Sequence, residues 1–156
     1  MIILGLAGAG LGAGIGWYGA HAGAVSQEKV IKQVPFQTYT IQSWPDGYKI
    51  DEASIAYDNG AYVFNLGDGN HTIQISQQKM PEASKLEEFM TKYLPRKKQL
   101  TGTPFESWVS DFPPGGTILG VKAEETWIVV ITTQKNAGEL LKAMAEKLEP
   151  NHQAGK

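Results

Sequence analysis

The chain contains no cysteine, and this absence excludes several kinds of chemistry at once. Without thiols there is no disulfide within the chain, no cysteine nucleophile and no cysteine-ligated metal site. Arginine is almost as scarce, because Arg96 is the only one among 14 basic residues, and the formal net charge is −2. A nucleic-acid-binding domain presents a basic face with many lysines and arginines. The single basic cluster, residues 96–98, is typical of a solvated loop, so we expect no nucleic-acid partner.

Histidine is rare too, and the three that occur, His21, His71 and His152, lie far apart in the chain. Their spacing matches no zinc site, and no loop has the acidic pattern of a calcium-binding EF-hand. Ser107 follows an acidic residue, but the G-x-S-x-G motif of serine hydrolases is missing. A surface histidine at a strand end is the ordinary case, so His71 is not assigned as a catalytic base. We predict no catalytic residue, no metal and no cofactor, and therefore a protein that is not an enzyme.

What the chain does contain is one long apolar run, residues 2–25, with eight glycines and no charged side chain. As a helix this run would be about 36 Å long, enough to cross a hydrocarbon core of about 30 Å. Small residues recur at every fourth position through Gly8, Gly12 and Gly16, and such a ridge allows two membrane helices to pack closely. We predict a membrane anchor over residues 1–26, whose ridge packs against a partner helix or a second copy of the chain.

Other interpretations of the same run stay open. Ala20-His21-Ala22 fits the small-x-small pattern of a cleavage site, so residues 1–26 are alternatively an export signal. Neither an anchor nor a signal has its usual basic residues before the run here, so the sequence does not fix the membrane orientation. The glycines also fit a dinucleotide-binding pattern, but no acidic residue follows about 20 positions later to hold a ribose. That third interpretation is disfavoured.

The rest of the chain predicts a polar linker at residues 27–35, one domain at residues 36–150 and a loose tail at residues 151–156. About 130 residues after the apolar run are enough for one domain with a sizeable core. Alternating or apolar runs predict strands at residues 36–41, 55–57, 62–66, 72–76, 108–112, 117–123 and 126–133. Asn59-Gly60 predicts a tight hairpin between the second and third of these strands, because both residues tolerate positive φ.

Two segments have the apolar period of a helix. The first begins after Pro81, with Ser84 and Glu87 spaced as a capping box, and ends before Pro95. The second follows Asn136, which we expect to cap it. The order of strands, helix, strands and helix predicts an α+β fold, in which an antiparallel sheet in two strand blocks has both helices packed on one face. An N-terminal transmembrane helix would precede this domain.

The motif Trp44-Pro45-Asp46-Gly47-Tyr48 resembles the P-[DE]-G-[YF] opening of a domain-of-unknown-function family. Residues 118–131 and 139–148 are similar to its closing hairpin and final helix, so the resemblance covers roughly residues 40–149. That family occurs as the extracytoplasmic C-terminal part of Gram-positive single-pass membrane proteins, some of them linked to sporulation or anti-sigma regulation. The resemblance implies no catalytic residues. Through its relation to lipoprotein-carrier folds, it implies a half-open sheet that could hold an apolar ligand.

Together these observations favour a non-enzymatic bacterial domain, tethered by a single span to the cell membrane and exposed on its outer side. Its partner would be a protein or an apolar ligand, and secretion after signal cleavage is the alternative location. A carrier of a lipid-like ligand is the second interpretation, and a hydrolase is the third. Aromatic residues in strands are mostly core residues, so we expect few of the five candidates for a binding surface to be exposed. These five are Trp44, Tyr48, Tyr57, Tyr62 and Trp108.

Overall fold

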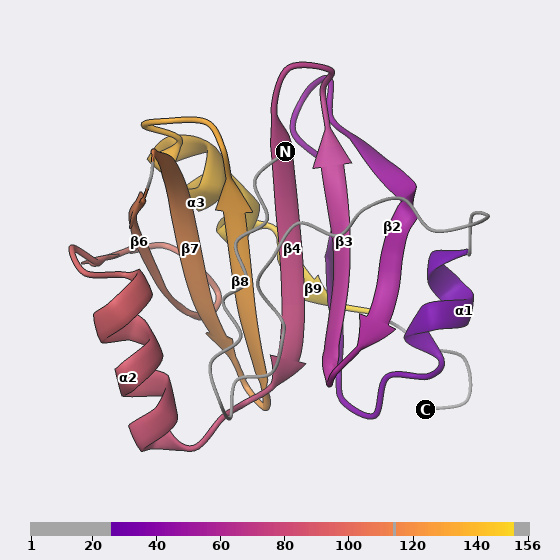
Figure 1. The fold of residues 1–156 in the computed structure, drawn as a ribbon, viewed down its shortest axis with the longest axis horizontal. Coiled ribbons are helices and arrows are strands. Elements are labelled where there is room, and N and C mark those ends of the chain that lie inside the picture. The colour runs from indigo at the N-terminus through magenta and orange to yellow at the C-terminus, as the bar shows by residue number, and fades with distance from the viewer. Residues whose placement is uncertain (1–25, 114, 152–156) are drawn as a thin grey trace.

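The computed structural model describes residues 26–113 and 115–151. Its central feature is an antiparallel sheet of seven strands in the order β2-β3-β4-β8-β7-β6-β5 (Figure 1). The strands are β2 (Lys49–Asp58), β3 (Ala61–Gly67), β4 (Thr72–Lys79), β5 (Lys98–Gln99), β6 (Glu106–Phe112), β7 (Gly116–Ala123) and β8 (Thr126–Thr132). The predicted α+β fold with an antiparallel sheet is confirmed. The two predicted strand blocks form one sheet, because β4 pairs with β8 along its whole length.

The hairpin between β2 and β3 forms where the sequence predicted it. Asn59 and Gly60 have φ angles of 51° and 82°, which are the left-handed values that a type I′ turn requires. At the other end of the same pair, β2 shifts register between Asp51 and Ala56. An irregularity of this kind twists an edge strand and makes it a poor template for pairing with another chain.

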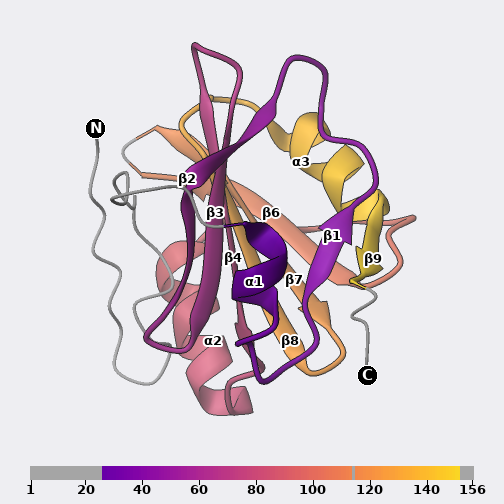
Figure 2. The same ribbon diagram turned by 90° about the vertical axis from the view of Figure 1, so that its right-hand side faces the viewer.

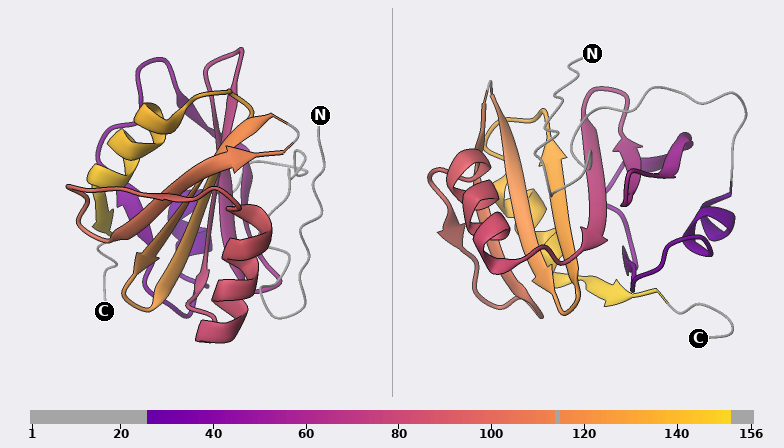
Figure 3. Two further views of the ribbon diagram at one scale, coloured as in Figure 1. Left: turned by 90° about the vertical axis from the view of Figure 1, so that its left-hand side faces the viewer. Right: turned by 60° about the horizontal axis from the view of Figure 1, so that its bottom comes forward.

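The prediction that both helices pack on one face of the sheet is wrong. Helices α2 (Ala83–Tyr93) and α3 (Gly138–Glu146) lie on opposite faces (Figures 2 and 3). The reason is that β8 (Thr126–Thr132) is buried over its whole length. Its side chains alternate between an apolar cluster with α2 and a second cluster with α3. A strand that is apolar on both sides needs cover on both faces.

Each face has its own apolar core. The cluster on the α2 face consists of Leu86, Phe89, Met90, Leu94, Trp108, Phe112, Ile118, Trp127, Val129 and Ile131. The larger cluster on the α3 face includes Phe64, Leu66, Ile73, Ile75, Leu119, Ile128, Val130, Leu141 and Met144. Burying both faces removes far more apolar surface from water than a single helical layer would, and this burial is the main term that stabilises the fold.

Residues 27–35, which the sequence analysis assigned to a linker, belong to the packed domain. They contain a short helix, α1 (Gln27–Ile31), which Ser26 caps by accepting a hydrogen bond from the Lys29 N–H. Val30, Ile31 and Val34 are buried in the core of the α3 face. Nε2 of Gln27 also donates to the Tyr62 hydroxyl at 2.7 Å, and burial raises the pKa of that phenol.

The same face carries a two-stranded ribbon of β1 (Tyr39–Ile41) and β9 (Leu148–Pro150), seen in Figure 2. The ribbon joins the beginning and the end of the domain, since Ile41 pairs with Leu148. The family resemblance predicted a final helix over residues 139–148, which would include Leu148. The helix ends at Glu146, so Leu148 reaches the same core from a strand.

Neither long helix uses its predicted cap. The first residue before α2 is Glu82, and no side chain caps its N-terminus, so Ser84 lies inside the helix. Ala137 holds the capping position of α3, also without a side-chain cap, and Asn136 has a φ of 55°. No helix among the described residues is long and apolar enough to cross a membrane. The apolar run with its ridge of Gly8, Gly12 and Gly16 lies outside the described residues.

Candidate functional site

Three loops lie together at one end of the sheet, at the ends of its strands. There β3 turns into β4, β6 turns into β7, and β8 leads to α3 (top of Figure 1). Backbone pairing holds these loops side by side. Thr117 pairs with Thr132 at the end of β8, and the N–H of Thr133 donates to the carbonyl of Thr72. Loops held by a stiff sheet are common positions for binding residues. We define the loop edge as residues 68–71, 112–113, 115–116 and 132–136, together with Arg96 and Asp111.

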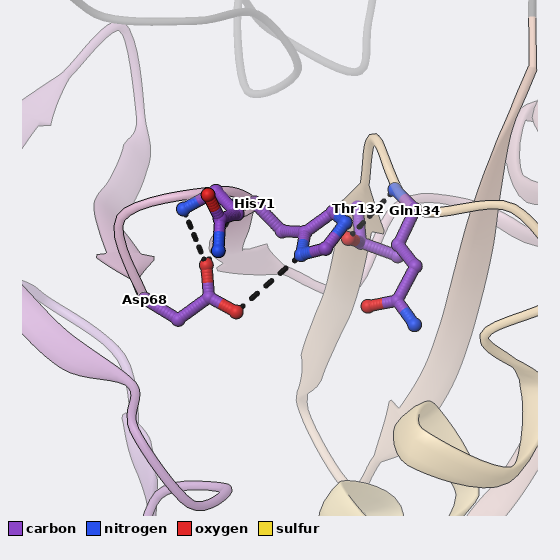
Figure 4. Close-up of polar contacts among 5 residues, drawn as sticks. Asp68, His71, Thr132 and Gln134 are labelled. Atoms are coloured by element: carbon purple, nitrogen blue, oxygen red, sulfur yellow. Dashed lines mark hydrogen bonds and ion pairs between the residues drawn. The ribbon is translucent and has the colours of Figure 1, made fainter.

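Asp68 organises the turn between β3 and β4. Its Oδ1 accepts hydrogen bonds from the backbone N–H groups of His71 at 2.6 Å and Asn70 at 2.8 Å. Its Oδ2 lies 3.4 Å from Nδ1 of His71 (Figure 4). These contacts, first of all the backbone N–H of His71, hold the pKa of Asp68 below its ordinary value. The carboxylate therefore stays ionised at neutral pH and orients the imidazole.

The imidazole of His71 points away from its own turn. Figure 4 places the ring between the Asp68 carboxylate and the end of β8. There the hydroxyl of Thr132 accepts the backbone N–H of Gln134 at 3.1 Å, and Thr132 is fully buried. Among the described residues no hydroxyl forms a hydrogen bond with the ring. A hydrolytic triad has such a hydroxyl as its third member, and the described contacts of Asp68 and His71 do not include one.

The motif that carries the family resemblance forms a turn next to this pair. The Tyr48 N–H donates to the Pro45 carbonyl at 3.0 Å. Gly47 has a φ of 83°, a backbone conformation that residues other than glycine rarely adopt. At one end of the turn the Trp44 ring packs edge-on against Phe64, with 5.8 Å between centroids. At the other end, burial and the charge of the neighbouring Asp68 raise the pKa of Tyr48. The motif therefore anchors the start of β2 and supports the Asp68 turn.

The second part of the loop edge is a hollow of about 380 Å³ between the β6–β7 turn and the loop before α3. It is lined by Arg96, Asp111, Phe112, Pro113, Gly115, Gly116, Lys135 and Asn136. Nη2 of Arg96 lies 3.2 Å from Oδ2 of Asp111, and both side chains are mostly exposed. No described carboxylate forms an ion pair with Lys135. The aliphatic part of its side chain packs over Gly115, where an added Cβ would be 3.0 Å from the lysine Cε.

The apolar core on the α3 face contains a small slot. A slot between the β1–β9 ribbon and the sheet is lined by Tyr39, Ile41, Trp44, Phe64, Met144, Leu148 and other core residues. Its volume of about 10 Å³ is near the minimum for one water molecule. An apolar cavity that binds benzene measures about 150 Å³, so a lipid chain does not fit into this slot without movement of the ribbon.

Most side chains that the sequence singled out as candidates have a structural role. Tyr62 is fully buried and Trp108 is nearly so. Ser107 is buried and donates its hydroxyl hydrogen bond to the carbonyl of Phe105. His21 and His152 lie outside the described residues. Of the basic cluster at residues 96–98, Arg96 alone lines the hollow. Asp111, Lys135 and Asn136 were not predicted as site residues, because nothing near them in the chain indicates that they line one hollow with Arg96.

Comparisons with protein-family models, with curated proteins and with solved structures gave no match. The family resemblance stays a prediction, and the site is interpreted from its own geometry. Within residues 26–113 and 115–151, no group of three histidine, cysteine, aspartate or glutamate side chains is placed to hold a metal ion. What the loop edge offers is an oriented imidazole, carboxylates, two cationic side chains and an amide, which together suit the recognition of a polar ligand.

Proposed function

We propose that this protein is a non-enzymatic sensor or interaction domain, tethered to a bacterial cell membrane by residues 1–26 and exposed on the outer side. One contrast carries the proposal. The slot between the β1–β9 ribbon and the sheet has a volume of about 10 Å³, whereas the loop edge has an open hollow of about 380 Å³ whose lining includes three charged side chains. A molecule of this shape meets its partner through the loop edge rather than by enclosing a ligand in its core.

The position of the tether is compatible with this role. The apolar run joins the domain at Ser26, which caps α1. Figure 1 shows α1 beside β2, at the side of the sheet opposite to β6 and α2. A tether attached there leaves the β6–β7 turn and the loop before α3 free to meet a partner. The closely packed α+β scaffold holds these loops in place, as is usual for binding surfaces.

Protease treatment of intact cells tests the outer location. We expect an added protease to digest the domain in intact cells, while a cytoplasmic control protein survives until lysis. A domain that is untouched in intact cells and digested only after lysis would refute the outer location. Sequencing the N-terminus of the mature protein tests the tether separately, because a chain that begins at Gly23 would have lost the anchor and would be a secreted protein.

A carrier of an apolar ligand is the competing function, and the filled slot makes it the weaker candidate. Binding a lipid chain there would require the β1–β9 ribbon to move away from the sheet, and this would expose the side chains of Tyr39 and Ile41. Native mass spectrometry after mild purification distinguishes the two functions. An interaction domain should have the mass of the chain alone, whereas a bound lipid would favour the carrier.

A further inference from the structure

We propose that the hollow between Arg96 and Lys135 binds a small organic carboxylate. The proposal rests on the proposed function, since it assigns a ligand to the sensor domain, but its test does not depend on where the protein is located. The hollow, of about 380 Å³, is in the size range of small-molecule pockets, which begins at about 300 Å³. It is much larger than a bare ion requires, so a ligand with an organic body fits it better.

The charge of the hollow points to one negative group on the ligand. Arg96 and Lys135 contribute two positive charges and Asp111 contributes one negative charge, which leaves one positive charge uncompensated. A single carboxylate complements that charge, whereas a doubly charged phosphate exceeds it. Asn136 adds an amide that can donate a hydrogen bond, and Phe112 and Pro113 form an apolar wall for the rest of the ligand.

Both cations are available to a ligand. The ion pair of Arg96 and Asp111 is exposed, with side-chain accessibilities of 78% and 64%, and exposed pairs of this kind contribute little to stability. One guanidinium has five N–H donors in a planar fork, so Arg96 can bind a carboxylate through two of them while still near Asp111. Lys135 has no described ion-pair partner and loses none on binding a ligand.

Hydrogen bonds hold the two segments that carry these cations. The backbone N–H of Arg96 donates to Oγ of Ser110 at 3.3 Å, which fixes the arginine next to the end of β6. The loop that carries Lys135 is held at both ends by Thr117, whose hydroxyl donates to the Gln134 carbonyl at 3.0 Å and accepts the Ala137 N–H at 3.1 Å. Such positioning lowers the cost of ordering the site when a ligand binds.

A titration of the full chain, held in nanodiscs of uncharged lipid, tests the proposal. The probes are benzoate, its neutral analogue benzamide, and inorganic phosphate, with binding followed by calorimetry and by amide chemical shifts. We expect benzoate to bind with a Kd on the order of 1 mM or tighter, and to shift the amides at residues 111–112 and 134–136. Arg96→Gln and Lys135→Gln should each weaken binding about tenfold or more, because each removes a charged hydrogen-bond donor.

Lys97→Gln is the matched control, since this lysine adjoins Arg96 in sequence but does not line the hollow, and it should bind benzoate as the parent does. Equal binding of benzamide and benzoate, or unchanged affinity in both hollow variants, would overturn the proposal. Stronger binding of phosphate than of benzoate would reject the assigned ligand class. The protease experiment on intact cells does not depend on any of these binding results. Failure of the carboxylate site can therefore be distinguished from failure of the outer location.

Discussion

The side-chain amide of Gln77 holds both backbone polar groups of Tyr39. Its Oε1 accepts the Tyr39 N–H at 2.7 Å, and its Nε2 donates to the Tyr39 carbonyl at 2.8 Å. The two residues come from different layers, since β4 is an interior strand of the seven-stranded sheet and β1 belongs to the two-stranded ribbon. Both are almost fully buried, with 0% and 1% exposure. The amide therefore takes the place of a neighbouring strand for a backbone that water cannot reach.

Replacing this amide should weaken the domain. Gln77→Leu removes both hydrogen bonds and leaves a buried N–H and a buried carbonyl without partners. Each unsatisfied group costs about 1–3 kcal/mol, so we expect the free energy of unfolding to fall by about 2–6 kcal/mol. Urea unfolding followed by tryptophan fluorescence measures this loss. Amide hydrogen exchange should also become faster in the β1–β9 ribbon than in β3 and β7.

The same strand supplies the control for that prediction. Gln74 lies three residues earlier on the opposite face of β4, is 2% exposed, and its Oε1 has no hydrogen-bond partner among the described residues. Gln74→Leu removes a buried polar group that gains little from its surroundings, so the change should be neutral or stabilising. If the two leucine variants lose equal stability, then the bonds to Tyr39 do not account for the loss in Gln77→Leu.

A second prediction concerns the close approach of Trp127 to Gly120. A Cβ on Gly120 would lie 2.5 Å from Cη2 of the indole, which is held edge-on against Phe89 at 5.9 Å between centroids. Trp127 is 1% exposed, so Gly120→Ala should cost about 1–3 kcal/mol or more through overpacking. Adding Trp127→Phe to that variant should recover part of the loss, because the smaller ring leaves room for the methyl group.

Thermal unfolding of the two single variants and the double variant gives the coupling energy between positions 120 and 127. Gly138→Ala is the control, since a Cβ there meets nothing within 4 Å and the residue begins α3. That change should be neutral or slightly stabilising, by up to about 1 kcal/mol. A Gly120→Ala variant as stable as Gly138→Ala would show that Trp127 does not fill the space above Gly120.

The parts of the fold that could be predicted are those with local signals. Asn59-Gly60 specifies its turn within four residues, and the stripe of Leu86, Phe89 and Met90 defines the buried face of α2. The placement of the helices on opposite faces depends on which sides of β7 and β8 are covered, and this is a property of the whole sheet. Likewise, the sequence of α1 was interpreted as a linker because its few apolar residues stand among polar ones. That these apolar residues are buried depends on the core against which they pack.

The candidate site was less predictable than the fold. Arg96, Asp111 and Lys135 are separated by 15 or more positions, and each alone resembles a solvated surface residue. They meet because β6 and β7 form a hairpin and β8 pairs beside it. Asp68 and His71 are close in sequence, and their turn could be anticipated, but their position near Tyr48 and the end of β8 depends on three strands pairing in the observed order.

The glycine ridge of the apolar run gives a prediction about the anchor. If residues 2–25 cross a membrane, Gly8, Gly12 and Gly16 lie on one face of the helix and allow a second helix to approach closely. Gly12→Ile should then weaken self-association in a membrane two-hybrid assay. Gly14→Ile, which adds the same side chain on another face, should weaken it less. Equal effects at the two positions, or a parent chain that does not associate, would argue against packing through the ridge.

The last prediction follows from the lowered pKa of Asp68. A carboxyl group that is more acidic in the native state than in the unfolded chain stabilises the fold when it is ionised. Its contribution is fully present above the ordinary pKa of 3.8 and disappears as the pH falls through the lower native value. Asp68→Asn keeps an oxygen that can accept the N–H groups of Asn70 and His71 but has no charge. The parent should therefore be more stable than this variant at neutral pH, and the difference should shrink as the pH falls below 3.8. Urea midpoints measured across that range test this, and a difference that does not change with pH would mean that the charge of Asp68 does not stabilise the turn.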